Sequence, residues 1–211
     1  MNYLKPETSL IEPFAVDFNL AEGVMLDPTS HLVRRASDMK GYYADKEALE
    51  RLIKDGNPVH YEVFEKPIPG EYGHLMYCIS KLQPGLVGNE YFMTKGHYHS
   101  RINTGEIYLA LRGTGLMLMM TPDGGCRHET LVPGRMVYVP PYWGHRSINT
   151  GREPLISFCV YPGDAGDVYK RQAFGRSSVP GLAGPSRGLG ERKLGCETLR
   201  PLSFDPGKRG P

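Results

Sequence analysis

From Val59 to Tyr161 the chain is a succession of short apolar or alternating runs, separated by Gly, Pro, Asn and Asp. Alternation with a period of two puts every second side chain on one face of a strand, so each run predicts a short, half-buried β-strand. Many short strands at fairly even spacing are typical of sandwiches and barrels, whereas βαβ folds need a helix between strands. We therefore predict an all-β fold, a double-stranded β-helix or jelly-roll barrel. The expected strands are Tyr61–Phe64, Leu75–Leu82, Glu90–Thr94, Ile107–Leu111, Leu116–Thr121, His128–Leu131, Arg135–Val139, Arg146–Asn149 and Leu155–Tyr161.

One short helix is expected before the strands, between Asp45 and Asp55. Asp45 can cap its start, its apolar residues recur at helical spacing, and Gly56 ends it. The N-terminal arm, residues 1–30, is expected to be irregular because prolines interrupt it, apart from a short strand at Phe14–Phe18.

Residues 170–211 differ in composition from the expected barrel domain, residues 31–169. They are rich in Gly, Pro and Arg and have no sustained apolar period, so they would bury little core. Nine of the 25 Lys and Arg residues lie there, against three of the 23 Asp and Glu residues, which leaves the rest of the chain mildly acidic. We predict a tail that is disordered or non-native, and no nucleic-acid partner for the body.

Signals for a membrane or for secretion are not found in the sequence. No apolar run reaches the ~18–20 residues of a membrane helix, and the first residues lack a basic start followed by an apolar stretch. The four cysteines form no C-x-x-C pair, and Cys78, Cys126 and Cys159 lie in or near strand-like runs. We therefore expect buried free thiols and a cytoplasmic protein without a membrane partner.

Three histidines and one glutamate stand where a mononuclear metal site would need them: His97, His99, Glu106 and His145. An H-x-H pair on a strand points to one face, and a third imidazole with a carboxylate would complete a shell open to water or substrate oxygens. Such a shell suits Fe(II), Mn(II), Ni(II) or Zn(II), and ligand softness alone does not choose among them. An H-x-H pair by itself is weak evidence, and we interpret three further histidines as surface or hydrogen-bonded residues. They are His60, His74 and His128.

These residues resemble the two sequence motifs of the cupin family. The first motif places an H-x-H pair, a Glu and a Gly in order, and the second a Gly, a Pro, a His and an Asn. The matching residues are His97, His99, Glu106 and Gly113, then Gly134, Pro140, His145 and Asn149. The gap before Glu106 is longer than usual, and Tyr142 stands where the second motif usually has Gly.

Within the cupins the chain resembles the archaeal-type glucose-6-phosphate isomerases over residues 13–166. The similar runs lie partly outside the cupin motifs: Leu32–Tyr43, Pro58–Phe64, Phe92–His99, Val137–Arg146 and Tyr161–Gly166. The resemblance implies a homodimer that interconverts glucose 6-phosphate and fructose 6-phosphate. It also implies one divalent metal ion per subunit, with Fe(II) expected first and Mn(II), Ni(II) or Zn(II) as alternatives.

The resemblance implies roles for single residues as well. The four metal ligands are those given above, and Glu106 would also be the catalytic base, with Tyr161 beside the substrate as a second catalytic residue. The expected substrate-binding residues are Tyr61, Ser80, Thr94, Gly96, Tyr108 and Tyr161. Tyr61, Ser80, Thr94 and Gly96 would line the phosphate end, where Lys95 is a further candidate. Tyr108 and Tyr161 would flank the sugar. Proton transfer through a cis-enediol is the preferred mechanism, with a hydride shift as the alternative.

The resemblance stops after Gly166. Asp167 stands where the family has a histidine that lines the substrate site, and the run Asp167–Gln172 resembles one reading frame of a transposon end sequence used as a library adapter. We therefore favour a foreign tail. Two other functions stay open at this point: another cupin enzyme, such as an Fe(II) dioxygenase, and a non-catalytic sugar-binding cupin.

Overall fold

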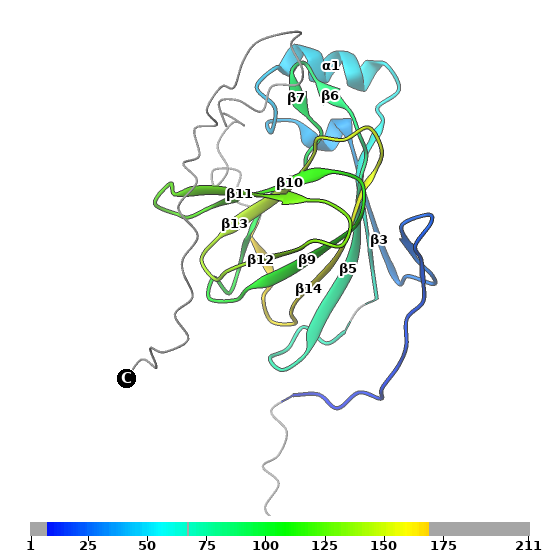
Figure 1. Cartoon of the computed structure of the whole chain (residues 1–211), viewed down its shortest axis with the longest axis vertical. Coiled ribbons are helices and arrows are strands. Elements are labelled where there is room, and N and C mark those ends of the chain that lie inside the picture. Colours follow the sequence, from blue (N-terminus) through cyan, green and yellow to red (C-terminus); the bar gives the residue numbers. More distant parts are fainter. Residues whose placement is uncertain (1–7, 67, 169–211) are drawn as a thin grey trace, which may run out of the picture.

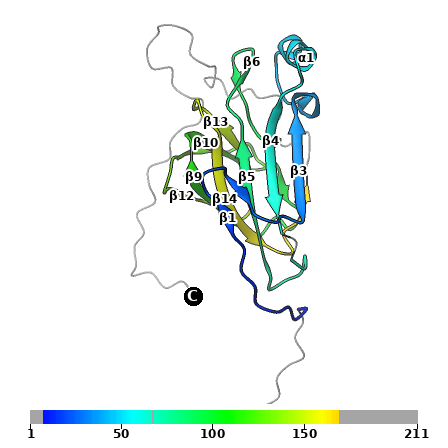
Figure 2. The ribbon, with the colours of Figure 1, turned by 90° about the vertical axis from the view of Figure 1, so that its right-hand side faces the viewer.

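Two antiparallel β-sheets face each other in the computed structural model, which describes residues 8–66 and 68–168 (Figure 1). The larger sheet has the strand order β12 (Met136–Val139), β9 (Glu106–Arg112), β14 (Leu155–Pro162), β5 (Leu75–Leu82), β4 (Val59–Glu65), β3 (Ser30–Arg35). The smaller sheet has the order β11 (Cys126–Leu131), β10 (Gly115–Met120), β13 (Gly144–Asn149). Figure 2 shows β3, β4 and β5 side by side, with β14 next to them.

The segment before β9 extends the smaller sheet alongside β13. Isolated bridges join Met93 to Ile148 and His97 to His145. The His97 N–H donates to the His145 carbonyl over 3.1 Å, and the His145 N–H donates back over 3.0 Å. The two facing sheets form the predicted all-β double-stranded β-helix, and this fold class is confirmed.

The core lies between the sheets, because inward and outward side chains alternate along the strands. On β12, Val137 and Val139 are buried while Met136 and Tyr138 are 59% and 55% exposed. On β9, Glu106, Tyr108 and Ala110 are buried in the same alternation. A carboxylate therefore occupies a core position of β9, where a structural strand would carry an apolar residue.

The predicted helix is confirmed as α1 (Lys46–Lys54). The Asp45 side chain accepts a hydrogen bond of 2.8 Å from the Ala48 N–H, and Gly56 has a φ of +99° just after the helix. Ala48 and Leu49 are buried against the end of the barrel, where α1 lies beside β6 (Leu86–Val87) and β7 (Glu90–Tyr91) (Figure 1). The N-cap, the buried apolar face and the glycine with positive φ after the last turn are thus all present.

Several strand bounds differ from the prediction. The strand expected at Phe14–Phe18 is wrong, because β1 (Phe18–Asn19) begins at its last residue and pairs only with β2 (Val24–Met25). The strand expected at Glu90–Thr94 ends at Tyr91. Leu32–Met39 divides into the end of β3 and a 3₁₀ helix, η1 (Ala36–Met39). Two-residue strands depend on tertiary pairing that local alternation does not encode.

The remaining expectations on the chain have mixed outcomes. Cys78 and Cys159 are buried free thiols, as predicted, but Cys126 is half-buried at the start of β11 and disulfide-bonded, so that expectation is wrong there. His60 is fully buried, so it is not a surface residue. Across the described residues no helix is both long and apolar enough to span a membrane. The predicted tail, residues 170–211, lies outside the described residues.

Candidate functional site

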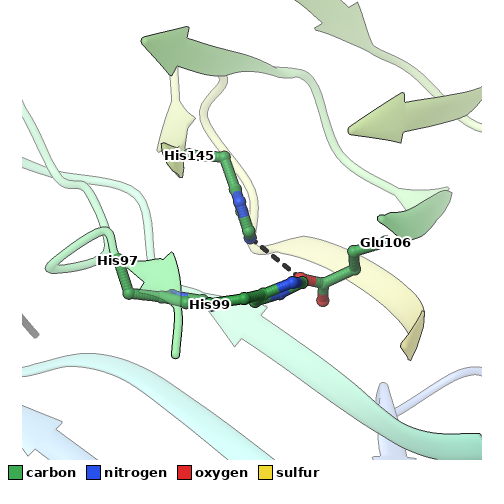
Figure 3. Close-up of side chains that lie close together, drawn as sticks. All are labelled: His97, His99, Glu106 and His145. Carbon is green, nitrogen blue, oxygen red and sulfur yellow. Dashed lines mark hydrogen bonds and ion pairs between the residues drawn. The ribbon is translucent and has the colours of Figure 1, made fainter. Parts of the chain in front are cut away.

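Four side chains converge between the two sheets, and they are the predicted metal ligands His97, His99, Glu106 and His145 (Figure 3). The nearest donor atoms of all four lie within 4.8 Å of one another. Glu106 Oε2 lies 2.9 Å from His145 Nε2 and 3.1 Å from His99 Nε2. Three of the four side chains are buried and His97 is half-buried, so the cluster is most accessible to solvent at His97.

Both sheets contribute to this cluster. Glu106 is the first residue of β9 in the larger sheet, and His145 lies on β13 in the smaller one. His97 is held opposite His145 by two backbone hydrogen bonds, and His99 lies on β8 (Tyr98–His99), which pairs with β15 (Asp167–Val168). Because side chains alternate, His97 and His99 point to the same side, while the Tyr98 hydroxyl donates to the Met120 carbonyl elsewhere.

Thr104 fixes the orientation and the protonation of His99. The Thr104 hydroxyl donates to the Arg101 carbonyl over 2.7 Å, so towards His99 Nδ1, 2.8 Å away, it can only accept. Nδ1 therefore carries the proton, and Nε2 presents its lone pair to the cluster. Thr104 is not recognisable as a site residue from the sequence, because a side-chain contact within a short loop leaves no periodic signal.

The charge of Glu106 is set by its neighbours. Burial alone would raise the pKa of this carboxyl, but the imidazoles of His145, His99 and His97 outweigh it and hold the pKa well below its ordinary value. Beside it, burial raises the pKa of Tyr108 well above its ordinary value, so this hydroxyl keeps its proton 3.1 Å from His145 Nε2. The cluster thus offers an ionised carboxylate, with a protonated phenol beside it.

The donor set fits a divalent transition metal. Three imidazole nitrogens and one carboxylate oxygen are ligands that such ions accept, and ligands of one ion lie about 2.0–2.2 Å from it. Donors within 4.8 Å of one another can reach a common centre with only small side-chain movements. Carboxylate and imidazoles packed together in this way need a cation or protons between them, since buried charges are paired.

A cavity opens beside the cluster, and every substrate-binding residue predicted from the sequence lines it. They are Tyr61, Ser80, Thr94, Gly96, Tyr108 and Tyr161. The inward positions of four adjacent strands form much of its wall: Tyr108 faces Cys159, Cys159 faces Cys78, and Ser80 faces Val63. Lys95 also lines the cavity.

Further residues of this wall were not predicted as site residues. Cys78 and Cys159 line the cavity, as does Glu65, which accepts a hydrogen bond of 3.3 Å from the Tyr161 hydroxyl. Arg146 lies behind Gly96 and is buried, with one guanidinium nitrogen donating to the Lys95 carbonyl over 2.9 Å. Nothing in the sequence pattern indicates that the two cysteines and Glu65 line one cavity or that Arg146 is buried behind Gly96.

Gly96 has a structural reason to be glycine. Its φ is +73°, and a Cβ there would lie 3.0 Å from Arg146 Nε. A left-handed residue just before His97 turns the chain so that the H-x-H pair enters the site. Tyr142 also has a positive φ, +72°, which explains why the second motif usually has glycine at that place.

Comparisons with known proteins give a consistent result. A family model described as "Glucose-6-phosphate isomerase (GPI)" matches residues 33–187, past Gly166, where the resemblance described above stops. The chain is 49% identical to the glucose-6-phosphate isomerase of Thermococcus litoralis over 158 residues, and 46% identical to that of Pyrococcus abyssi over 158 residues. Each alignment covers 75% of this chain and 83% of the relative.

Among solved structures, an oxalate decarboxylase formate complex from Lactobacillus farciminis aligns with a TM-score of 0.42 and 21% identity. The alignment covers 52% of this chain and 31% of the oxalate decarboxylase chain.

Proposed function

This chain belongs to the glucose-6-phosphate isomerase family, and from that premise we propose that it interconverts glucose 6-phosphate and fructose 6-phosphate at one divalent metal ion. The observation that carries the proposal is the convergence of three imidazoles and a carboxylate on a cavity lined with hydroxyl groups. His97, His99, Glu106 and His145 would hold the ion. When bound, such an ion would bind the reacting oxygens of the sugar and stabilise their negative charge.

The phosphate end of the substrate is assigned to the part of the cavity formed by Tyr61, Ser80, Thr94 and Gly96. The Thr94 hydroxyl accepts a hydrogen bond of 3.0 Å from the Ser147 N–H, which leaves its own proton for a phosphate oxygen. The Tyr61 hydroxyl is hydrogen-bonded to the Arg34 side chain and to the Lys95 backbone. Basic side chains near this end favour a dianionic group.

Glu106 is assigned the proton transfer between C1 and C2 of the sugar. Its carboxylate is ionised, so one oxygen can hold the metal while the other accepts a proton from carbon. Tyr108 and Tyr161, which line the cavity, would flank the sugar, and Tyr161 would also act on the reacting oxygens. A hydride shift is the alternative mechanism, in which Glu106 would be a ligand only.

The native metal, the assembly and the compartment are further parts of the proposal. Fe(II) is the first expectation, followed by Mn(II), Ni(II) and Zn(II), because histidine and carboxylate ligands accept all four. A homodimer is supported by the exposed Met136 and Tyr138 on the edge strand β12, which a second copy could cover. A cytoplasmic location agrees with the sugar-phosphate substrate.

The first test measures turnover of fructose 6-phosphate by chelated protein, with and without each of the four metals. We expect turnover to return with at least one metal and to be lost in His97→Ala. His128→Ala is the matched control, because His128 lies on β11 outside the cluster. Protein that binds metal stoichiometrically but turns over no sugar phosphate with any of the four would sink the proposal.

A second test separates the two roles of Glu106. Glu106→Gln keeps an oxygen ligand but removes the proton acceptor, so we expect retained metal and a loss of more than ~100-fold in kcat. Metal content is measured on the same sample as kcat. Full activity in this variant would exclude Glu106 as the base and leave the hydride shift.

A further inference from the structure

Two free thiols face each other on the wall of the cavity. Cys78 on β5 and Cys159 on β14 are direct partners in the antiparallel pair of these strands. Both are buried, and both line the cavity that the predicted substrate residues line. Neither has a role in the proposed isomerase reaction.

The geometry of the strand pair brings the two sulfur atoms together. Directly opposite residues in an antiparallel pair have Cβ atoms about 4.5–5.5 Å apart, and both side chains point to the same face. The Cys159 thiol donates a hydrogen bond of 3.8 Å to the Ser157 carbonyl on its own strand, which leaves its sulfur on the face shared with Cys78. Tyr108, the cross-strand neighbour of Cys159 on its other side, places the pair beside the metal cluster.

We propose that Cys78 and Cys159 form a dithiol site that binds a thiophilic ligand by bridging the two sulfurs, with trivalent arsenicals as the ligand class. In the reaction with an arsenoxide, both S–H bonds break and two As–S bonds form. The arsenic-bound oxygen leaves with the two protons as one water molecule. Arsenic stays trivalent and both sulfurs stay reduced, so the step needs no oxidant or reductant.

Arsenical capture suits this pair better than oxidation does. Burial, followed by the neighbouring Cys78, raises the pKa of Cys159 well above its ordinary value. Peroxides react with thiolates, so a buried neutral thiol is a poor target for them. An arsenoxide instead reacts with the neutral thiols, and its oxygen leaves as water with both thiol protons. The second As–S bond forms within the same strand pair, so the two bonds together give a higher affinity than either would alone.

A bound arsenical would lie in the sugar cavity and exclude the sugar phosphate. This consequence rests on the proposed isomerase function, whereas formation of the adduct does not. The ligand would occupy space beside Tyr108 and leave the four metal ligands in place. Inhibition without loss of metal is therefore expected.

The experiment treats the full-length protein with phenylarsine oxide and measures the adduct by intact mass. Wild type should gain the mass of one phenylarsine oxide less one water, and a small dithiol should reverse the adduct. The variants Cys78→Ala and Cys159→Ala should each bind at least ~100-fold more weakly, because the chelate is lost. Val160→Ala is the matched control, since Val160 lies on the same strand as Cys159 but does not line the cavity, and it should bind like wild type.

Thermal unfolding of each variant checks that it is folded. A second measurement uses wild type alone: saturating fructose 6-phosphate should slow the rate at which the adduct forms. No adduct on wild type, or an adduct retained in both cavity variants, would overturn the dithiol site. Absence of turnover in untreated protein would instead count against the isomerase function, because adduct formation is read without turnover.

Discussion

At the scale of single residues, the proposed metal cluster depends on a side chain outside the four expected ligands. The Thr104 hydroxyl accepts a hydrogen bond from His99 Nδ1 and donates one to the Arg101 carbonyl. Partners of this kind fix the tautomer and ring orientation of a ligand, and their loss usually costs 10–100-fold in metal affinity.

Replacing Thr104 by valine keeps the shape of the side chain and removes the hydroxyl. We expect Thr104→Val to weaken metal binding by roughly 10–100-fold, because His99 Nδ1 loses its hydrogen bond of 2.8 Å to the hydroxyl and keeps only the longer one, 3.3 Å, to the Thr104 carbonyl. Thr104→Ser should restore most of the affinity. Titration of chelated protein with Mn(II) or Zn(II) against a competing chelator gives the dissociation constants. Equal affinity of wild type and the valine variant would exclude a positioning role.

The four residues that converge could be predicted from the sequence, and the reason is chemical. An H-x-H pair, a glutamate and a third histidine are polar residues placed in strand-like runs, where their burial needs a reason. Thr104, Cys78 and Cys159 carry no such signal, because a threonine in a loop and cysteines in apolar strands are common everywhere. The role of Thr104 follows from hydrogen bonds within one loop, and that of the two cysteines from the pairing of their strands.

At the scale of elements, two glycines of the sequence motifs lie in turns of the barrel, and the two turns require glycine for different reasons. Gly113, between β9 and β10, has a φ of +80°, and a Cβ there would lie 2.4 Å from the Pro154 carbonyl oxygen. Gly134, between β11 and β12, has a φ of +82° with nothing within 4 Å of a Cβ. The first turn needs both a left-handed backbone and free space, the second only the backbone.

Alanine at these two positions should therefore have unequal effects. A left-handed conformation costs an L-residue about 1–2 kcal/mol, so Gly134→Ala should lower the free energy of unfolding by about that amount. Gly113→Ala should lower it further, because the Pro154 backbone must also move. Urea unfolding of both variants measures the difference. If Gly134→Ala were the more damaging, the close approach at Gly113 would not matter for stability.

Strands with long alternation and the capped helix were predicted well, while short elements were not. β5 has the bounds expected from its pattern, and β9 differs by one residue at each end. β8 and β15 are two residues each and exist because they pair with each other. A local pattern reports which face is buried, but the pairing partner of a short strand is decided by the whole barrel.

At the scale of the whole molecule, stability should depend on pH through His60. This ring is fully buried and stacked on Phe92 with ring centres 3.7 Å apart. Burial lowers its pKa from 6.5 to about 4. The unfolded chain therefore binds a proton below pH 6.5 that the folded protein does not bind until about pH 4.

Because the folded pKa is depressed, the stabilisation is complete above pH 6.5 and is lost as the pH falls towards 4. The expected loss is about 3 kcal/mol, at 1.36 kcal/mol per unit of pKa difference. His60→Phe keeps a ring against Phe92 and should flatten the decline over this interval. Urea unfolding of chelated protein at a series of pH values measures it, with His128→Phe as the control. An unchanged slope in His60→Phe would exclude this residue as the source.

The order of the strands in the larger sheet has a consequence for how the chain is made. β14 comes last among the strands of that sheet, yet it lies in its middle, between β9 and β5. A nascent chain that has emerged only as far as residue 154 holds two half-sheets with open edges, which other chains can join. The wall that carries Cys159 and Tyr161 closes only when this strand is inserted. We therefore expect the sugar cavity to form after synthesis has passed β14, and folding to be slow for a chain of this length.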